Sequence, residues 1–119
     1  MNTKGFLNAR QLNLHHAEHG ADFGAKSASE YERLADEFLG SAKHPDVHEC
    51  TRSRGDMIRF NPKTDEYGVL DGNGIIRTYF KPVPCASLPP AQRTAMRQAG
   101  RCHSQTTNLV YFQEECKKW

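Results

Sequence analysis

Three turn-forming segments between residues 47 and 81 constrain this chain more than any other feature of its sequence. They are Arg54-Gly55-Asp56, Asn61-Pro62-Lys63-Thr64 and Asp71-Gly72-Asn73-Gly74. Glycine, asparagine, aspartate and proline supply the backbone geometry that tight turns need. The runs between them are short and rich in β-branched and aromatic residues, which is typical of strands. The sequence therefore predicts a four-stranded antiparallel meander over residues 47–81.

Two helices are predicted ahead of this sheet. The first covers residues 6–19 and is expected to end with Gly20 as the residue beyond its C-terminus. The second covers residues 28–40, because Ser27 to Glu30 has the form of a capping box. Its apolar residues recur at helical spacing: Tyr31, Leu34, Ala35, Phe38 and Leu39. The predicted fold class is α+β, with both helices on one sheet face and the other face free for a substrate.

The pattern weakens after Pro82. A short helix is predicted over residues 90–99, with proline near its first position, and the run LVYFQ at residues 109–113 is interpreted as a fifth strand. The 119 residues fit one domain. We divide it into a core over residues 6–82 and a C-terminal extension over residues 83–119.

Composition sets limits on the class of protein. No apolar run approaches the ~20 residues of a membrane span, and the first residues lack the apolar region of a signal peptide. A net charge of +2 permits a nucleic acid partner without requiring one. Residues 77–101, however, contain five cations and no acid: Arg77, Lys81, Arg93, Arg97 and Arg101. This predicts a phosphate-facing surface, with a solvated charged face as the alternative.

The four cysteines, Cys50, Cys85, Cys102 and Cys116, contain no C-x-x-C pair, which argues against a zinc ribbon. Three lie in the last third of the chain, so one disulfide there is compatible with an oxidising compartment. The sequence leaves their pairing open.

His15 and His19 are the first candidates for chemistry. They stand four residues apart in the first predicted helix and so share one face. Two such imidazoles suit acid–base catalysis or phosphate binding near neutral pH. They could also supply two of the three ligands of a catalytic zinc site. A third reading is a structural one, because protonated histidine stabilises the last turn of a helix.

Arg59 and Arg77 are the second candidates, because each lies in the middle of an apolar strand. In a regular strand Tyr79 shares a face with Arg77. A buried arginine needs a carboxylate or an anionic ligand, so the two arginines either form salt bridges or clamp one phosphate. With the histidines they could supply a base, cations and an acid without metal or cofactor. RNA brings its own nucleophile, the 2′-hydroxyl, which DNA lacks. We therefore predict a metal-independent ribonuclease that leaves a 2′,3′-cyclic phosphate.

Three segments, HGADFG, GDMIRF and DGNGIIRTYFKP, occur in the order found in a C-terminal nuclease module of bacterial polymorphic toxins, contact-dependent inhibition proteins and phage-derived proteins. Over residues 12–82 the chain resembles this barnase, EndoU, colicin and RelE-like class of nucleases. The resemblance implies helices packed on an antiparallel sheet. It also implies RNA as substrate, with transfer RNA one candidate, and a small immunity protein as partner. The site of action would be the bacterial cytoplasm, reached as part of a larger secreted protein.

The resemblance also implies roles for individual residues: His19, His15, Arg59, Arg77, Thr78 and Tyr79. Two site geometries remain open. One is an open sheet face with Arg59, Arg77 and Tyr79; the other is a cleft between the first helix and the sheet with His19 and Thr78. In both, the helices are expected to cover Ile76 and Phe80. We favour the cleft because it alone brings a histidine within reach. A non-catalytic RNA- or protein-binding module and a phage structural or adaptor protein are the alternative functions.

Overall fold

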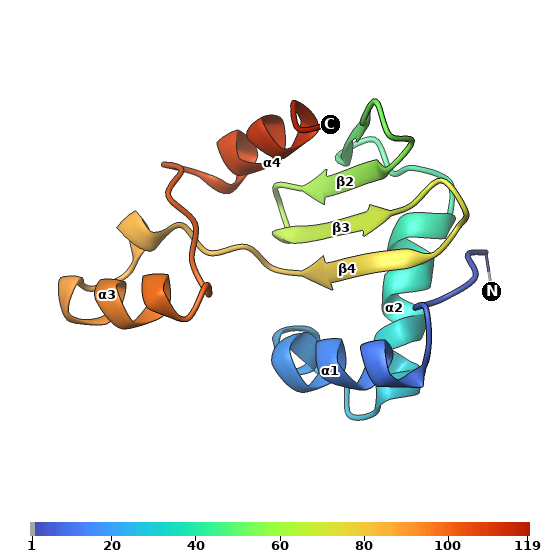
Figure 1. Cartoon of the computed structure of the whole chain (residues 1–119), viewed down its shortest axis with the longest axis horizontal. Coiled ribbons are helices and arrows are strands. Elements are labelled where there is room, and N and C mark those ends of the chain that lie inside the picture. Colours follow the sequence, from blue (N-terminus) through green and yellow to red (C-terminus); the bar gives the residue numbers. More distant parts are fainter. Residues whose placement is uncertain (1) are drawn as a thin grey trace.

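A four-stranded antiparallel sheet with helices against both of its faces forms the centre of the computed structural model, which describes residues 2–119 (Figure 1). The strands are β1 (His48–Thr51), β2 (Met57–Asn61), β3 (Glu66–Leu70) and β4 (Ile76–Phe80), in the order β1-β2-β3-β4. The helices are α1 (Ala9–His19), α2 (Ala28–Gly40), α3 (Pro90–Gln98) and α4 (Asn108–Cys116), with short 3₁₀ turns η1 (Gly20–Phe23) and η2 (Cys85–Ser87). The predicted α+β class and meander are confirmed.

Helix α2 forms as its sequence predicts. The Ser27 hydroxyl accepts a hydrogen bond from the Glu30 amide at 3.1 Å, and the Glu30 carboxylate accepts one from the Lys26 amide at 3.2 Å. These bonds satisfy amides that a helix start leaves free. The apolar stripe of α2 then packs on the sheet in one buried cluster that comprises Phe6, Ala25, Tyr31, Ala35, Leu39, Ile76 and Tyr79. This cluster is the main core of the domain.

A second core lies on the opposite sheet face, beneath α4. There Phe112 of α4 packs with Ile58, Phe60, Tyr67 and Val69 of the sheet. The prediction of a fifth strand at residues 109–113 is wrong, because these residues belong to α4. The Thr107 hydroxyl caps this helix by accepting from the Val110 amide at 3.1 Å, and the contacts of Phe112 outweigh the strand propensity of the run. The sheet face that the sequence predicts to be free is therefore partly covered.

A β-bulge in β4 changes which residues share a face. Val69 pairs with Thr78 and Leu70 pairs with Ile76, so Arg77 has no partner residue on β3. Ile76 and Tyr79 consequently both face α1 and α2, although three positions separate them. Phe80 belongs to the opposite face and packs with the cluster beneath α4. The expectation that the helices cover Ile76 and Phe80 together is wrong for Phe80.

Residues 83–119 leave β4, form α3 and return to the sheet through α4 (Figure 1). The predicted helix near residues 90–99 is confirmed as α3, with proline in its first turn. Two disulfides, Cys50–Cys116 and Cys85–Cys102, settle the pairing that the sequence leaves open. The first attaches α4 to β1. Within residues 2–119, none of the helices is long and apolar enough to cross a membrane.

Candidate active site

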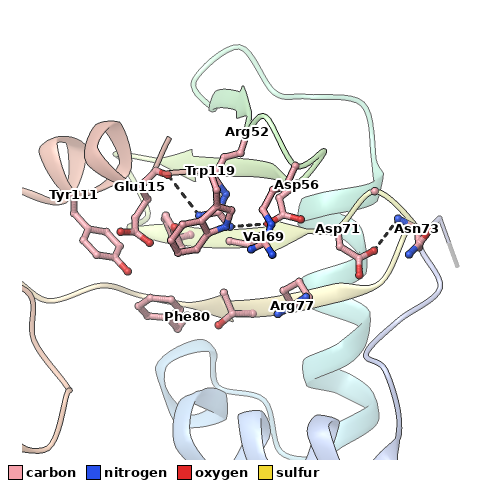
Figure 2. A pocket seen from close by; sticks show the side chains of 14 residues that line it. Arg52, Asp56, Val69, Asp71, Asn73, Arg77, Phe80, Tyr111, Glu115 and Trp119 are labelled. Atoms are coloured by element: carbon pink, nitrogen blue, oxygen red, sulfur yellow. Dashed lines mark hydrogen bonds and ion pairs between the residues drawn. The ribbon is translucent and has the colours of Figure 1, made fainter. Parts of the chain in front are cut away.

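Two neighbouring cavities open beside β4 and share Phe80 and Tyr111 in their walls. The sheet cavity, about 750 Å³, lies over β3 and β4 and is bordered by α4 and Trp119 (Figure 2). Its polar side chains include Arg52, Arg54, Asp56, Asp71, Arg77, Thr78 and Glu115. The histidine cavity, about 480 Å³, lies between the end of α1 and residues 96–103, and its polar side chains are Glu18, His19, Asp22, Lys81, Arg101, His103 and Tyr111.

His19 is placed by a turn that needs two glycines for different reasons. Helix α1 continues directly into η1, so Gly20 has a helical φ of −58° and is not the left-handed terminator that the sequence predicts. A side chain at Gly20 would collide with the His16 ring, 2.4 Å from an added Cβ. The left-handed residue is Gly24, with a φ of 65°. The segment HGADFG thus reverses the chain while holding His19 at its start.

The surroundings of His19 favour its neutral form. Its ring contacts the Phe80 ring with centroids 5.3 Å apart, and its Nε2 lies 3.5 Å from a Glu18 carboxylate oxygen. Burial lowers the pKa of His19 and the Arg101 cation lowers it further, while Glu18 and Asp22 act in the opposite direction. The net effect is a pKa below the ordinary value. A neutral imidazole beside a cavity can accept a proton at neutral pH.

His15 lies behind His19 rather than in either cavity. Its ring packs against Phe6 at 5.1 Å and against His19 at 6.0 Å. Burial lowers its pKa, and the neighbouring His19 lowers it further. Its buried Nδ1 has no hydrogen-bond partner within residues 2–119. The structure therefore places His15 as a support for the His19 ring.

His103 lines the histidine cavity but has no free ring nitrogen. Its Nδ1 accepts a hydrogen bond from the Gln105 amide at 3.2 Å, so Nε2 carries the proton and donates to Asn108 Oδ1 at 2.8 Å. Its ring also stacks on Tyr111, with centroids 4.4 Å apart. These contacts fix His103 as a structural residue and orient Tyr111.

Tyr111 presents a protonated hydroxyl where the two cavities meet. Burial and the nearby Glu115 raise the pKa of Tyr111 to about 12, although Tyr67 and the Arg52 cation act in the opposite direction. The hydroxyl of Tyr111 therefore carries its proton at neutral pH.

Arg77 and Thr78 both line the sheet cavity, although neighbours in a regular strand point to opposite faces. The bulge at Arg77 removes this conflict. Figure 2 shows Arg77 projecting from β4 toward the cavity. Within residues 2–119 Arg77 makes no ion pair, whereas the nearby Arg52 pairs with Asp56 at 2.9 Å. Arg54 lines the same cavity and lies over the Trp119 ring, also without an ion pair within residues 2–119. Arg77 and Arg54 are thus the cations of this cavity that are available to an anionic ligand.

Arg59 and Tyr79 lie on the opposite, helix-covered side of the sheet. Arg59 is buried and donates hydrogen bonds to Glu49 at 2.7 Å and to the carbonyls of Phe38 and Ser41 at 3.0 and 2.7 Å. These contacts satisfy the buried cation and join β1, β2 and the end of α2. The salt-bridge alternative thus describes Arg59 in this structure.

Tyr79 is also engaged within the protein. Its hydroxyl donates to Glu66 at 2.5 Å, its ring stacks on Phe23 at 4.1 Å, and its carbonyl accepts a hydrogen bond from the Tyr31 hydroxyl. The expected geometry with Arg59, Arg77 and Tyr79 on one open face is therefore wrong. The cleft geometry is met only in part, since His19 and Thr78 line adjoining cavities rather than the same one.

Sequence reasoning missed three residues of the histidine cavity: Lys81, Arg101 and Tyr111. Lys81 and Arg101 belong to the basic, acid-free stretch at residues 77–101. The sequence therefore showed their charge but not that they lie beside His19 in one cavity. Tyr111 was hidden because its segment was interpreted as a strand. Within residues 2–119 no three His, Cys, Asp or Glu side chains gather as a metal site would require.

Comparison with known proteins does not identify the family of this chain. No family model matches the chain, and no curated protein matches it. Among solved structures it is similar to a ribonuclease from Escherichia coli complexed with its inhibitor protein, with a TM-score of 0.47 and 22% sequence identity. The match covers 75% of this chain and 96% of that chain. The activity and the inhibitor complex belong to that protein, so a function for this chain has to be inferred from its own side chains.

Proposed function

We propose that this chain is a metal-independent endoribonuclease whose catalytic centre is the histidine cavity. One observation carries the proposal. A single cavity of about 480 Å³ is lined by the neutral imidazole of His19, the protonated hydroxyl of Tyr111 and the two cations Lys81 and Arg101. A base, an acid and phosphate-binding cations are what cleavage of RNA by its own 2′-hydroxyl requires.

His19 acts as the base and Tyr111 as the acid. The His19 imidazole takes the proton of the 2′-hydroxyl while the 2′-oxygen forms a bond to phosphorus. The bond from phosphorus to the 5′-oxygen breaks, and Tyr111 donates its proton to that oxygen. The products are a 2′,3′-cyclic phosphate and a free 5′-hydroxyl. Arg101 and Lys81 stabilise the additional negative charge of the phosphoryl group in the transition state.

The sheet cavity takes the neighbouring nucleotide of the same strand. Phe80 and Tyr111 separate the two cavities and offer aromatic faces on which bases can stack. Arg77 and the Thr78 hydroxyl then bind the next phosphate. In this arrangement Thr78 and Arg77 position the substrate, whereas Arg59 and Tyr79 hold the sheet and helices together.

Two substitutions test the chemistry. His19→Gln and Tyr111→Phe are each expected to lower kcat for RNA cleavage by about 10²–10⁴-fold, the usual contribution of an acid or base. His44→Gln is the matched control, because His44 is an exposed loop histidine with a 66% exposed side chain. Thermal melts of each variant separate lost chemistry from lost folding.

Two further measurements test the mechanism. Cleavage should persist in EDTA, and a single 2′-deoxy substitution at the cut site should abolish it. Full activity of folded His19→Gln would refute the role of α1. RNA binding without cleavage by the unmodified protein would instead favour the non-catalytic RNA-binding alternative.

We further propose that a small acidic inhibitor protein covers both cavities and that transfer RNA is among the substrates. The expected site of action remains the bacterial cytoplasm after delivery within a larger secreted protein. The two disulfides agree with folding in an oxidising compartment before delivery. Copurification of a co-expressed acidic partner with the chain, lost when Arg77 and Arg101 are both changed to glutamate, would support the inhibitor.

A further inference from the structure

The segment from Pro84 to His103, here named the arm, is built as a separate unit on the sheet domain. Pro84 and His103 pair at its base, where the Cys85 amide donates to the His103 carbonyl at 2.8 Å. The Cys85–Cys102 disulfide closes the same base. Helix α3, inside this loop, packs on η2 and buries none of its own residues. Figure 1 shows α3 standing away from the sheet.

The arm carries a net positive charge, which the rest of the chain does not. It contains Arg93, Arg97 and Arg101 and no acid, so it carries +3 while the whole chain carries +2. The rest of the chain is therefore slightly negative. A net charge confined to one projecting element indicates a polyanionic partner rather than a general need for solubility.

The arm cations lead outward from the histidine cavity. Arg101 lines that cavity and lies close enough to lower the pKa of His19. Met96, Ala99 and Gly100 of the arm line the same cavity. Arg97 follows on α3, exposed and without an ion pair within residues 2–119. Arg93, one turn earlier, donates to the carbonyls of Leu88 and Ala86 and holds the arm in shape.

We infer that the arm binds the phosphate backbone of an RNA beyond the phosphodiester that is cut, so that the preferred substrate is a folded RNA longer than the cavities can hold. This inference rests on the proposed ribonuclease function. The Cys85–Cys102 disulfide ties the arm at its base, beside the cavity of His19, while α3 buries none of its own residues. A covalent tie at the base of the arm reduces the ordering cost of binding a structured backbone.

Binding in an inactive background tests the arm independently of cleavage. In the His19→Ala variant, Arg97→Gln is expected to weaken binding of unfractionated transfer RNA by about two- to fivefold, the effect of losing one exposed ion pair. The slope of log K against log salt should fall by about 0.7–0.9, the amount expected for one phosphate contact. Arg10→Gln is the control, because Arg10 is an exposed helical arginine near the far end of α1.

Cleavage provides the second measurement. In the active protein, Arg97→Gln should lower the ratio of kcat/KM for transfer RNA to that for a dinucleoside monophosphate, whereas Arg10→Gln should leave this ratio unchanged. Equal binding and equal salt slopes for the two variants would overturn the inference. Binding that depends on Arg97 without any cleavage would retain the arm and reject the proposed function.

Discussion

Removal of the Cys50–Cys116 disulfide should destabilise the protein more than removal of the Cys85–Cys102 disulfide. The bridge closes 66 residues, for which the loop-entropy relation gives about 4 kcal/mol. For 119 residues the unfolding entropy is about 0.25 kcal/mol/K. The double variant Cys50→Ala/Cys116→Ala is therefore expected to melt about 16 °C lower than the unmodified protein.

The second disulfide serves as the matched control. It closes 17 residues, for which the same relation gives about 3 kcal/mol. Because α3 buries no residue of its own, most of this stabilisation should act on the arm alone. Cys85→Ala/Cys102→Ala should thus lower the stability of the sheet domain by clearly less than about 3 kcal/mol.

Urea unfolding without reductant, followed by far-UV circular dichroism, measures both effects. Trp119 is the only tryptophan and stacks near Arg52 and Arg54, with guanidinium carbons 5.4 and 5.6 Å from its ring centroid. Its fluorescence therefore reports the C-terminal segment separately. A change of less than about 1 kcal/mol in the Cys50/Cys116 variant would refute the loop-closure reasoning. Equal losses in both variants would show that the arm unfolds together with the sheet.

Three further predictions concern single side chains. Arg59→Met should lower stability by about 1–3 kcal/mol, because it leaves the carbonyls of Phe38 and Ser41 without their donor while the exposed Glu49 stays solvated. The fraction that remains folded should keep a near-normal kcat in a urea-calibrated assay. The acidic limb of kcat/KM should have its midpoint below 6.5, the ordinary histidine value, because burial lowers the pKa of His19 and the base must be unprotonated. Arg101→Gln should move this limb to higher pH, although it also lowers the rate. Burial raises the pKa of Asp36, but hydrogen bonds from Thr3 and the Asn2 amide outweigh it and lower the pKa overall. The stability that Asp36 adds is therefore present at neutral pH and lost as pH falls through its folded pKa, an acid-dependent loss in urea titrations that Asp36→Asn should remove.

Local signals account for the parts of the fold that the sequence predicts correctly. The capping box at Ser27 and the apolar spacing of α2 are satisfied within one helix, so neighbouring elements add to them without changing them. The three turns likewise fix an antiparallel order that needs no long-range information. By contrast, α4 depends on contacts of Phe112 with strands about fifty residues earlier in the chain. Strand propensity depends only on residue type, so the β-branched and aromatic residues of the run at 109–113 predict a strand.

The candidate site was predicted unevenly for the same reason. His19 was found because its motif is local, and its neutral form follows from neighbours that the motif does not contain, Phe80 and Arg101. Arg59 was interpreted as a possible phosphate ligand because its strand looks apolar. The side chain that pairs with it, Glu49, lies directly opposite on β1. Assigning its role therefore required the strand register, which the sequence alone did not give.

The spacing of Ile76 and Tyr79 in the sequence is a signal for the bulge at Arg77, which a model of strict alternation misses. Ile76 and Tyr79 are both apolar and three residues apart, so a regular strand would bury one and expose the other. It would also point Arg77 to the side of Tyr79, into the core formed by Phe6 and Tyr31, where an unpaired cation is costly. One extra residue avoids both costs, since it keeps Ile76 and Tyr79 in that core and turns Arg77 toward the cavity of Thr78. An odd spacing of buried residues around a charged one is thus a sequence signal for a bulge, and here the bulge places two predicted site residues in the same cavity.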